Sequence, residues 1–434
     1  MQDPRSVRAW EHTLAGRWLP GVHLVMGAAC CVAVSFPISV LEFAIAITAV
    51  ATVVRIAGTW RLVVAALAHP IVICTLLWGL WLVAGVAWSA DPRAGWSDAG
   101  RMRLALVLVA LWPLAHRRGV LIAAYLCGFA VGHVMQLVQV FGGRTFLEGL
   151  ISTTMSPDRI SGWWGPVSGG SMLCVPLGMH IWAAVHGRGR WRAVAITGVA
   201  VTFAAILATG TRGAWVSAAV LLVIGGVCAC RRGRRRVLVI GAGALAAALA
   251  VAWLVFGDVL ASRVRDARNE LAAAQAGEVE TNIGARLVMW ETAIAAFRAH
   301  PIKGVGTGGY AAWGREELAR TSPELDPRLV MDHAHGMYVH TAATGGVVGL
   351  VILGSLLFVV AWWGGRDDPA AGERLQASGY SSSIRLGLVG LLIAAMFETV
   401  TVGMRVGVHL WMMAALAPVW GGAIVRARDA RPRG

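Results

Sequence analysis

Two polar stretches in an otherwise apolar chain carry side chains suited to proton transfer and to phosphate binding. In the run Asp332-His-Ala-His-Gly-Met-Tyr338, His335 comes shortly before an apolar segment that begins near Thr341. A neutral imidazole accepts a proton from a hydroxyl group near neutral pH, so His335 is a candidate base at a membrane surface. In Thr209-Gly-Thr-Arg-Gly213, Arg212 is permanently charged and can bind phosphate oxygens in pairs, which makes it a candidate diphosphate ligand.

Other interpretations of these and similar motifs stay open. An arginine at the end of an apolar segment, such as Arg212, is often a snorkelling anchor. The alternating pair His333 and His335 is reminiscent of metal ligands, but the sequence positions no third ligand, so we predict no metal. The run Gly304-Val-Gly-Thr-Gly-Gly309 matches GxGxxG, yet no strand is expected before it. A flexible glycine turn is therefore favoured over a dinucleotide site.

The composition predicts an all-α polytopic membrane protein that positions these residues. The 434 residues are 57% hydrophobic and only 14% charged, whereas soluble domains carry about a quarter charged residues. Apolar runs long enough to cross a bilayer recur along the chain and predict about twelve transmembrane helices. These runs fall near residues 19–36, 37–54, 70–88, 104–116, 120–141, 166–186, 193–209, 213–230, 237–257, 341–363, 386–404 and 406–425.

The distribution of arginine predicts the orientation. A net charge of +15 on a soluble protein would suggest nucleic acid, but here the arginines gather in short loops, as in positive-inside sorting. We therefore expect membrane lipids and no nucleic acid as partners. The strongest cluster, Arg231 to Arg236, predicts a cytoplasmic loop, and alternation places both termini on that side. The loops 89–103, 142–165, 210–212 and 258–340 then face the opposite side, the periplasm of a bacterium, where Arg212 needs a reason other than sorting.

Three regions follow along the chain. Residues 1–257 hold the first nine transmembrane helices, 258–340 form one long, partly helical periplasmic loop, and 341–434 hold the last three helices and a cytoplasmic tail. In the loop, Ser262–Glu280 predicts a polar, solvent-facing helix, and Gly284–Ala299 predicts a second helix that Pro301 ends. The second helix has one apolar face, suited to lying on the membrane or on the helical bundle. That face comprises Ile283, Leu287, Trp290, Ile294 and Phe297.

Further residues are second-tier candidates for substrate binding. Arg159 lies in the 142–165 loop beside Trp163 and Trp164, aromatic residues that also mark membrane interfaces. Glu398 is a carboxylate at membrane depth, and Arg405 follows seven residues later, so we expect them to share a helix face and to pair. His333 is another candidate. Tyr338 either orients His335 or is an interfacial tyrosine.

Several motifs together resemble the O-antigen ligase superfamily. They are Thr209-Gly-Thr-Arg-Gly213, Arg286 with Trp290, His300-Pro-Ile-Lys-Gly-Val-Gly306, Ala334-His335, and Gly346-x-x-Gly349. The superfamily includes ligases that join O-antigen to lipid A–core, O-antigen polymerases and pilin-type oligosaccharyltransferases. The spacing from His335 to the last glycine pair is similar to the ligase pattern. One departure is that the family usually has Asn, Ser or Gln after the histidine, where this chain has Gly336.

The resemblance implies an inner-membrane glycosyltransferase with a periplasmic site. Arg212 and Arg286 would hold the diphosphate of an undecaprenyl-diphosphate-linked glycan, with Trp290 beside them. His335 would take the proton from an acceptor hydroxyl of lipid A–core, which attacks with inversion and without a metal or other cofactor. The alternatives are an O-antigen polymerase or a protein O-oligosaccharyltransferase. A transporter or flippase of lipid-linked glycan is a different class, which would need no base.

Overall fold

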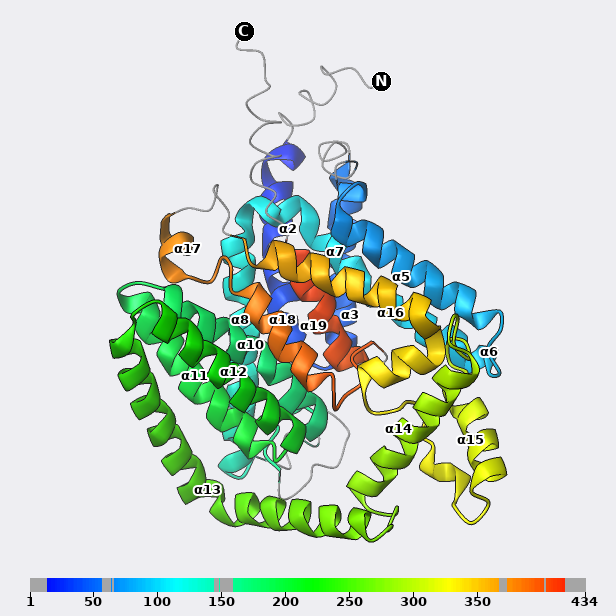
Figure 1. Ribbon diagram of the computed structural model, residues 1–434. Helices are drawn as coiled ribbons and strands as arrows, with labels where there is room; N and C mark the ends of the chain where they lie inside the picture. The colour runs from blue at the N-terminus through cyan, green and yellow to red at the C-terminus, as the bar shows by residue number, and fades with distance from the viewer. Residues whose placement is uncertain are drawn as a thin grey trace.

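A computed structural model describes residues 14–56, 64, 66–143, 148, 159–366, 373–401 and 403–417, and within these ranges the chain is helical and contains no strand (Figure 1). Arg5 and Arg8 near the N-terminus and the arginines of the C-terminal tail, from Arg426 onward, lie outside these ranges. The helices are α2 (Leu14–Val32), η1 (Ala33–Ser35), α3 (Ile38–Val54), α5 (Pro70–Val86), α6 (Pro92–Gly100), η2 (Arg101–Ala105), α7 (Leu106–Leu111), η3 (Trp112–Arg117), α8 (Arg118–Val140), α10 (Pro166–His186), α11 (Arg190–Ala208), α12 (Arg212–Arg231), α13 (Arg235–Gln275), α14 (Asn282–Ala299), α15 (Tyr310–Thr321), η4 (Pro327–Leu329), α16 (Met337–Gly364), α17 (Glu373–Ser378), α18 (Ile384–Ala394) and α19 (Met404–Leu416).

The chain is a multi-pass membrane protein. Its described part contains seven helical stretches long and apolar enough to cross a bilayer, and four shorter apolar helices. The prediction of about twelve spans is not confirmed in number. Besides 341–363, where α16 is interrupted at Gly346, two of the expected spans depart most from a single α-helix.

The first exception is 104–116, where the six-residue α7 lies between two 3-10 helices and Pro113 begins the second. The other is 386–404, because α18 ends at Ala394 and α19 begins only at Met404. Between them stand the polar Glu398 and the β-branched residues Thr399 to Thr401. The β-branched residues favour helix less than straight-chain residues do.

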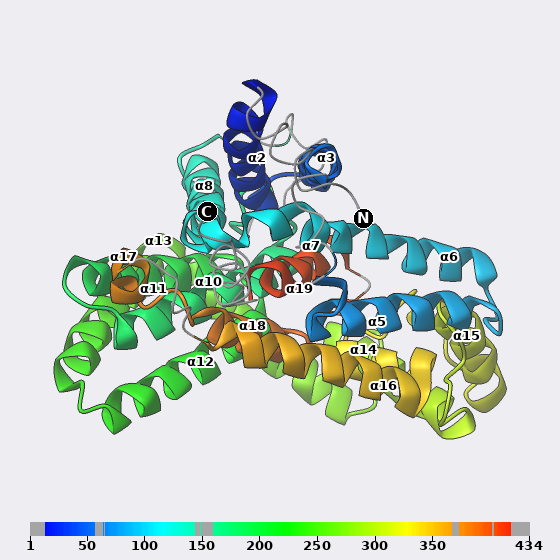
Figure 2. The same cartoon turned by 90° about the horizontal axis from the view of Figure 1, so that it is seen from above.

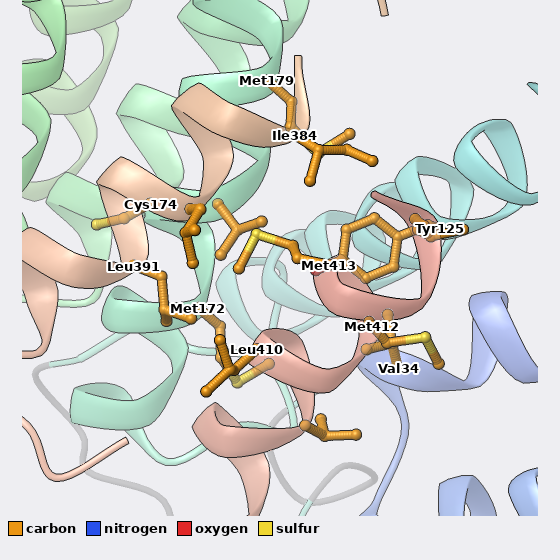
Figure 3. Packing of buried hydrophobic residues seen from close by; sticks show 14 of the residues in the cluster. Val34, Tyr125, Met172, Cys174, Met179, Ile384, Leu391, Leu410, Met412 and Met413 are labelled. Atoms are coloured by element: carbon orange, nitrogen blue, oxygen red, sulfur yellow. The ribbon is translucent and has the colours of Figure 1, made fainter. Parts of the chain in front are cut away.

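Helix α10 forms the centre of the bundle, where α11, α12 and α18 pack around it (Figure 2). Most of its residues are buried, and its small residues allow close approach. A side chain at Gly178 would overlap the backbone of α18 at Leu386. Figure 3 shows the apolar side chains that fill the space between α10, α18 and α19, among them Met172, Leu391 and Met413.

Helix α16 is broken at Gly346, and the segment with the glycine run after α14 supplies hydrogen-bond partners for the freed backbone groups. Gly346 has φ of +62°, which interrupts the helical hydrogen bonds. The freed carbonyls of Ala343 and Thr344 accept from Val305 and Gly306, while Val347 and Val348 donate to the carbonyls of Pro301 and Ile302. The segment with the GxGxxG run therefore binds the two sides of the break in α16 through backbone hydrogen bonds. The prediction of a flexible glycine turn did not include this role.

We expect Gly346→Ala to destabilise the protein by about 2–4 kcal/mol, because a left-handed residue with a side chain is strained. The added methyl group would also overlap the carbonyl of Ile302. Thermal unfolding of the detergent-purified protein measures the loss. Gly354→Ala is the matched control, since no atom lies within 4 Å of a side chain added there on the same helix. Equal unfolding temperatures for the two variants would contradict this account of the break.

The polar segment between α12 and α16 folds as a helical arch. Helix α13 bends at Phe256 (φ −132°, ψ 17°), and its second half crosses the lower end of the molecule before α14 leads back toward α16 (Figure 1). The predicted separate helix Ser262–Glu280 is thus the continuation of α13, and it ends at Gln275. Helix α14 matches its predicted range closely and ends at Ala299, with His300 as its C-cap just before Pro301.

The apolar face predicted for α14 packs on the bundle only in part. Leu287 and Ile294 are exposed, whereas Ile283, Trp290 and Phe297 are half-buried. The helix also uses smaller, buried side chains to approach α16 closely. The alternative in which the exposed face lies on the membrane stays a prediction.

Candidate active site

His335 stands in a loop whose backbone is held in an unusual conformation. Its φ of +46° makes it the one non-glycine residue with positive φ in the part of the chain that the structure describes. Such strain costs about 1–3 kcal/mol and is found preferentially at functional sites. The loop is pinned to the end of α18, since Met337 donates its N–H to the carbonyl of Ala395 at 2.8 Å. Tyr338 adds a second tie through its hydroxyl group, which donates to the carbonyl of Leu392 at 2.7 Å. Tyr338 therefore anchors the loop to α18, and no hydrogen bond links its hydroxyl group to His335.

The His335 imidazole is neutral and has an unused nitrogen. Its Nδ1 atom is buried without a hydrogen-bond partner, and the ring of His333 lies 4.4 Å away between centroids. Burial, followed by the charges of His333 and Arg286, lowers the pKa of His335 to about 4. At neutral pH the ring therefore holds a lone pair that can accept a proton. Burial and the Arg101 charge lower the pKa of His333 against the opposing effect of Asp332, so it is a second neutral imidazole at the site.

Arg286 joins the histidine loop to a second group of charges. It projects from the first turns of α14 and is half-buried, and burial lowers its pKa while the carboxylates of Glu398 and Glu270 oppose that effect. Glu398 is only 9% exposed, and its carboxylate interacts electrostatically with the Arg286 guanidinium. Glu398 thus compensates the charge of Arg286.

The predicted pairing of Glu398 with Arg405 is wrong. The break between α18 and α19 puts the two residues on different elements, and no ion pair within 4.0 Å joins them. The i, i+7 argument fails because it requires one continuous helix. No described contact brings Arg405 to the histidine loop. Glu398 belongs to the site through Arg286, as a partner of its guanidinium.

Arg212 is the first residue of α12 and faces the arch. Its Nη2 atom donates to Glu270 Oε2 at 2.7 Å, and its Nη1 atom is buried without a partner. No side chain caps the N-terminus of α12, so its first backbone N–H groups and the helix dipole favour an anion there. The charge of Arg212 also lowers the pKa of Arg286, so the two guanidinium groups lie close enough to repel each other. An arginine that serves only as a membrane anchor would not need a buried carboxylate partner.

Arg159 lies beside Arg212, held by the loop that links α11 and α12. It donates from Nε to the carbonyl of Thr209 and from Nη2 to Thr211 Oγ1, both at 2.8 Å. Burial and the charges of Arg263 and Arg212 lower the pKa of Arg159 to about 10. Most of the 142–165 loop, including Arg144 and Asp158, lies outside the described residues.

The neighbours Trp163 and Trp164 do not mark an interface. They are only 5% and 4% exposed, and Trp164 Nε1 donates to the carbonyl of Ser35 at 2.7 Å. Both therefore belong to the bundle core, because each indole finds an apolar surrounding there and one of them finds a backbone acceptor.

Trp290 reaches the histidine loop at Gly336. A side chain on Gly336 would begin only 3.3 Å from Trp290 Nε1 and 3.1 Å from the carbonyl oxygen of Met396. The glycine at this position, the one departure from the family pattern, therefore lets the indole and the end of α18 approach the loop. Trp290 Nε1 is buried without a partner and is free to donate to a ligand.

The fold thus assembles most of the predicted site. His335, His333, Trp290, Arg286 and Glu398 meet around the histidine loop, while Arg212 and Arg159 continue the cationic surface toward α13. Sequence reasoning missed Glu270 and Arg263, both on α13. Their spacing of seven residues in an Ala-rich polar helix was the available signal. Among the described side chains, no three His, Cys, Asp or Glu gather in positions that suit a metal ion.

Comparison with known families finds a match for about a third of the chain. Residues 197–354 match a family model described as O-antigen ligase. The matched segment runs from α11 into α16 and contains Arg212, Arg286 and His335. The match confirms the resemblance to the O-antigen ligase superfamily and supports a glycosyltransferase-type enzyme of the ligase and polymerase group. A comparison with curated protein sequences finds no match.

Proposed function

We propose, from the O-antigen ligase match over residues 197–354, that the chain transfers O-antigen glycan from undecaprenyl diphosphate to a sugar hydroxyl of lipid A–core. The site would face the periplasm of a bacterial inner membrane, with both chain termini in the cytoplasm. The observation that carries the proposal is a neutral His335 next to the buried guanidinium of Arg286. One group suits deprotonation of an acceptor, and the other suits a departing anion.

The reaction is a single displacement with inversion. The acceptor oxygen forms a bond to the anomeric carbon as the bond from that carbon to the phosphate oxygen breaks. The hydroxyl proton passes to His335, and the leaving diphosphate keeps the electron pair of the broken bond. Arg286 and Arg212 stabilise the negative charge that develops on the diphosphate, a role that a divalent ion fills in other enzymes. Glu398 and Glu270 hold these guanidinium groups in place before the donor arrives.

The test uses purified full-length protein, undecaprenyl-diphosphate-linked glycan and lipid A–core, in the presence of a chelator. A ladder of glycan on the lipid A–core band supports a ligase without a metal requirement. Lengthened lipid-linked glycan with unmodified lipid A–core would make the chain a polymerase, and glycan on an added pilin-type protein would make it an oligosaccharyltransferase. Loss of activity that Mg²⁺ or Mn²⁺ restores would contradict the role given to the arginines. Movement of lipid-linked glycan between leaflets without transfer would indicate a flippase.

The pH dependence of this assay tests the base. The active form of His335 is neutral, so protonation removes activity as the pH falls through its pKa. Because burial and neighbouring charges lower that pKa to about 4, we expect kcat/KM to stay level from pH 8 to about 5 and to fall tenfold per unit below pH 4. The diphosphate of a bound donor favours the imidazolium form, so kcat should fall at a higher pH than kcat/KM.

His333→Ala supplies the comparison for this profile. In acid, a proton on His333 disfavours a second proton on His335, so removal of His333 should move the acidic limb of kcat/KM to higher pH. A wild-type limb near pH 6.5, the ordinary value for an exposed histidine, would show that His335 is not the base in this environment.

A further inference from the structure

The second half of α13 presents two charged side chains to the site. Arg263 and Glu270 are seven residues apart, two helical turns, and both are partly buried. Glu270 is the partner of Arg212 and also accepts from Asn282 Nδ2 at 3.2 Å, at the start of α14. Arg265 and Arg268, on the other side of the same helix, are exposed. The inner face of this half of α13 therefore closes over the cationic surface described above.

Arg263 and Arg159 approach each other around Gly210. The point at which a side chain on Gly210 would begin lies 3.4 Å from Arg263 Nε and 3.6 Å from Arg159 Nε. Arg159 is fixed by its bonds to Thr209 and Thr211. Arg263 forms an ion pair with Asp266, 4.0 Å away and half-exposed, where water screens its charge. Within the described part of the chain, two guanidinium groups thus approach Gly210 with no ion pair to a buried carboxylate.

Among the residues that the structure describes, the charges of this cluster are unbalanced. Arg159, Arg212, Arg263 and Arg286 carry four positive charges, and the inward carboxylates Glu270 and Glu398 carry two negative charges. Part of the repulsion is visible in Arg159, whose pKa is lowered by burial and by its neighbours Arg263 and Arg212. Partly buried cations that exceed their counter-charges are stabilised by a bound anion. A diphosphate esterified at both ends carries two negative charges and would complete the balance.

We propose that Arg263 and Arg159 form a second phosphate-binding pair, which takes the lipid-linked phosphate of the donor while Arg286 and Arg212 take the glycan-linked phosphate. The inference rests on the proposed function. Its assignment follows from position, because Arg286 acts on His335, where the sugar must react, whereas Arg159 and Arg263 lie beyond Arg212. Arg263 is then a positioning residue that holds the lipid-linked phosphate, which a lipid diphosphate and a lipid monophosphate share.

The test measures binding of undecaprenyl diphosphate and of undecaprenyl monophosphate to the purified full-length protein. We expect Arg263→Ala to weaken binding of both lipids about ten- to a hundredfold, because the phosphate that they share is the lipid-linked one. Arg286→Ala should weaken diphosphate binding and leave monophosphate binding unchanged. Arg265→Ala, which removes the same charge from the exposed side of the helix, should change neither affinity. Thermal unfolding confirms that all three variants are folded.

Other outcomes separate this inference from the proposed function. If Arg263→Ala and Arg265→Ala bind the diphosphate equally well, the second pair does not exist, even if the wild type transfers glycan. Loss of diphosphate binding alone in Arg263→Ala would place Arg263 at the glycan-linked phosphate and would also overturn the inference. Equal loss of monophosphate binding in Arg263→Ala and Arg286→Ala would reduce Arg263 to general attraction of anions, with the same consequence. If Arg263→Ala weakens both lipids and Arg286→Ala only the diphosphate while the wild type transfers no glycan, the binding pair stands and the proposed reaction fails.

Discussion

Replacing His335 with alanine is expected to lower kcat for glycan transfer about 10²- to 10⁴-fold, the usual contribution of a positioned general base. The acceptor hydroxyl would have to lose its proton to water inside a partly closed site. Binding of the donor should change little, because the imidazole is neutral and offers the diphosphate no charge. Alanine at this position also keeps the strained backbone, where φ is +46°, so part of the folding cost remains in the variant.

The measurement is the initial rate with lipid-linked glycan and lipid A–core, together with the KM for the donor. His300→Ala is the matched control, since His300 is an exposed histidine of the same polar segment. The control should keep the rate within about twofold of the wild type, as surface substitutions usually do. Equal rates of glycan transfer by His335→Ala and His300→Ala would show that His335 is not the base and would leave His333 as the remaining candidate.

Replacing Arg286 with alanine is expected to lower kcat/KM about 10²- to 10³-fold, comparable to the loss of one donor to a developing negative charge. Arg286 is the guanidinium whose charge acts on both the histidine base and the partner Arg212. Arg286→Lys should recover only part of the rate, because an ammonium group lacks the planar pair of donors that binds phosphate oxygens.

The same substitution affects stability, and a double variant separates the two effects. Without Arg286, the buried carboxylate of Glu398 loses its opposite charge, which is destabilising. Arg286→Ala combined with Glu398→Gln should therefore unfold at a higher temperature than Arg286→Ala alone while remaining as inactive. Arg298→Ala is the control from the same helix, because that arginine is exposed. A rate for Arg286→Ala within twofold of Arg298→Ala would contradict the diphosphate role.

The membrane-spanning helices were predictable wherever one uninterrupted apolar segment crosses the bilayer. Helices α10, α11 and α12 lie within a few residues of their predicted ranges, since a bilayer requires long apolar segments with internal hydrogen bonds. Helix α14 was also predictable, because Pro301 cannot continue a helix. Prediction failed where backbone bonds are satisfied by another segment, as at Gly346 in α16, or where polar residues interrupt a span, as after Ala394.

The sequence predicted the kinds of residue in the candidate site but did not predict all of its residues. His335, Arg286 and Arg212 were found because their residue types and motifs suggest their chemistry, and the match over residues 197–354 contains all three. Glu270 and Arg263 were missed because a charged residue on a polar helix is usually solvated, and periodicity does not say which face turns inward. The bend at Phe256 decides that face.

The sequence by itself determined an all-α membrane protein that resembles the O-antigen ligase superfamily, with a histidine and arginines as candidates for the chemistry. These properties depend on composition, local patterns and residue type, all of which can be read along the chain. Only the tertiary structure decided that Glu398 interacts electrostatically with Arg286 and forms no ion pair with Arg405, and that Glu270 and Arg263 lie close to the arginines. Charge pairing across segments depends on distances of a few ångströms, which helix breaks and bends set and which spacing along the chain does not reveal.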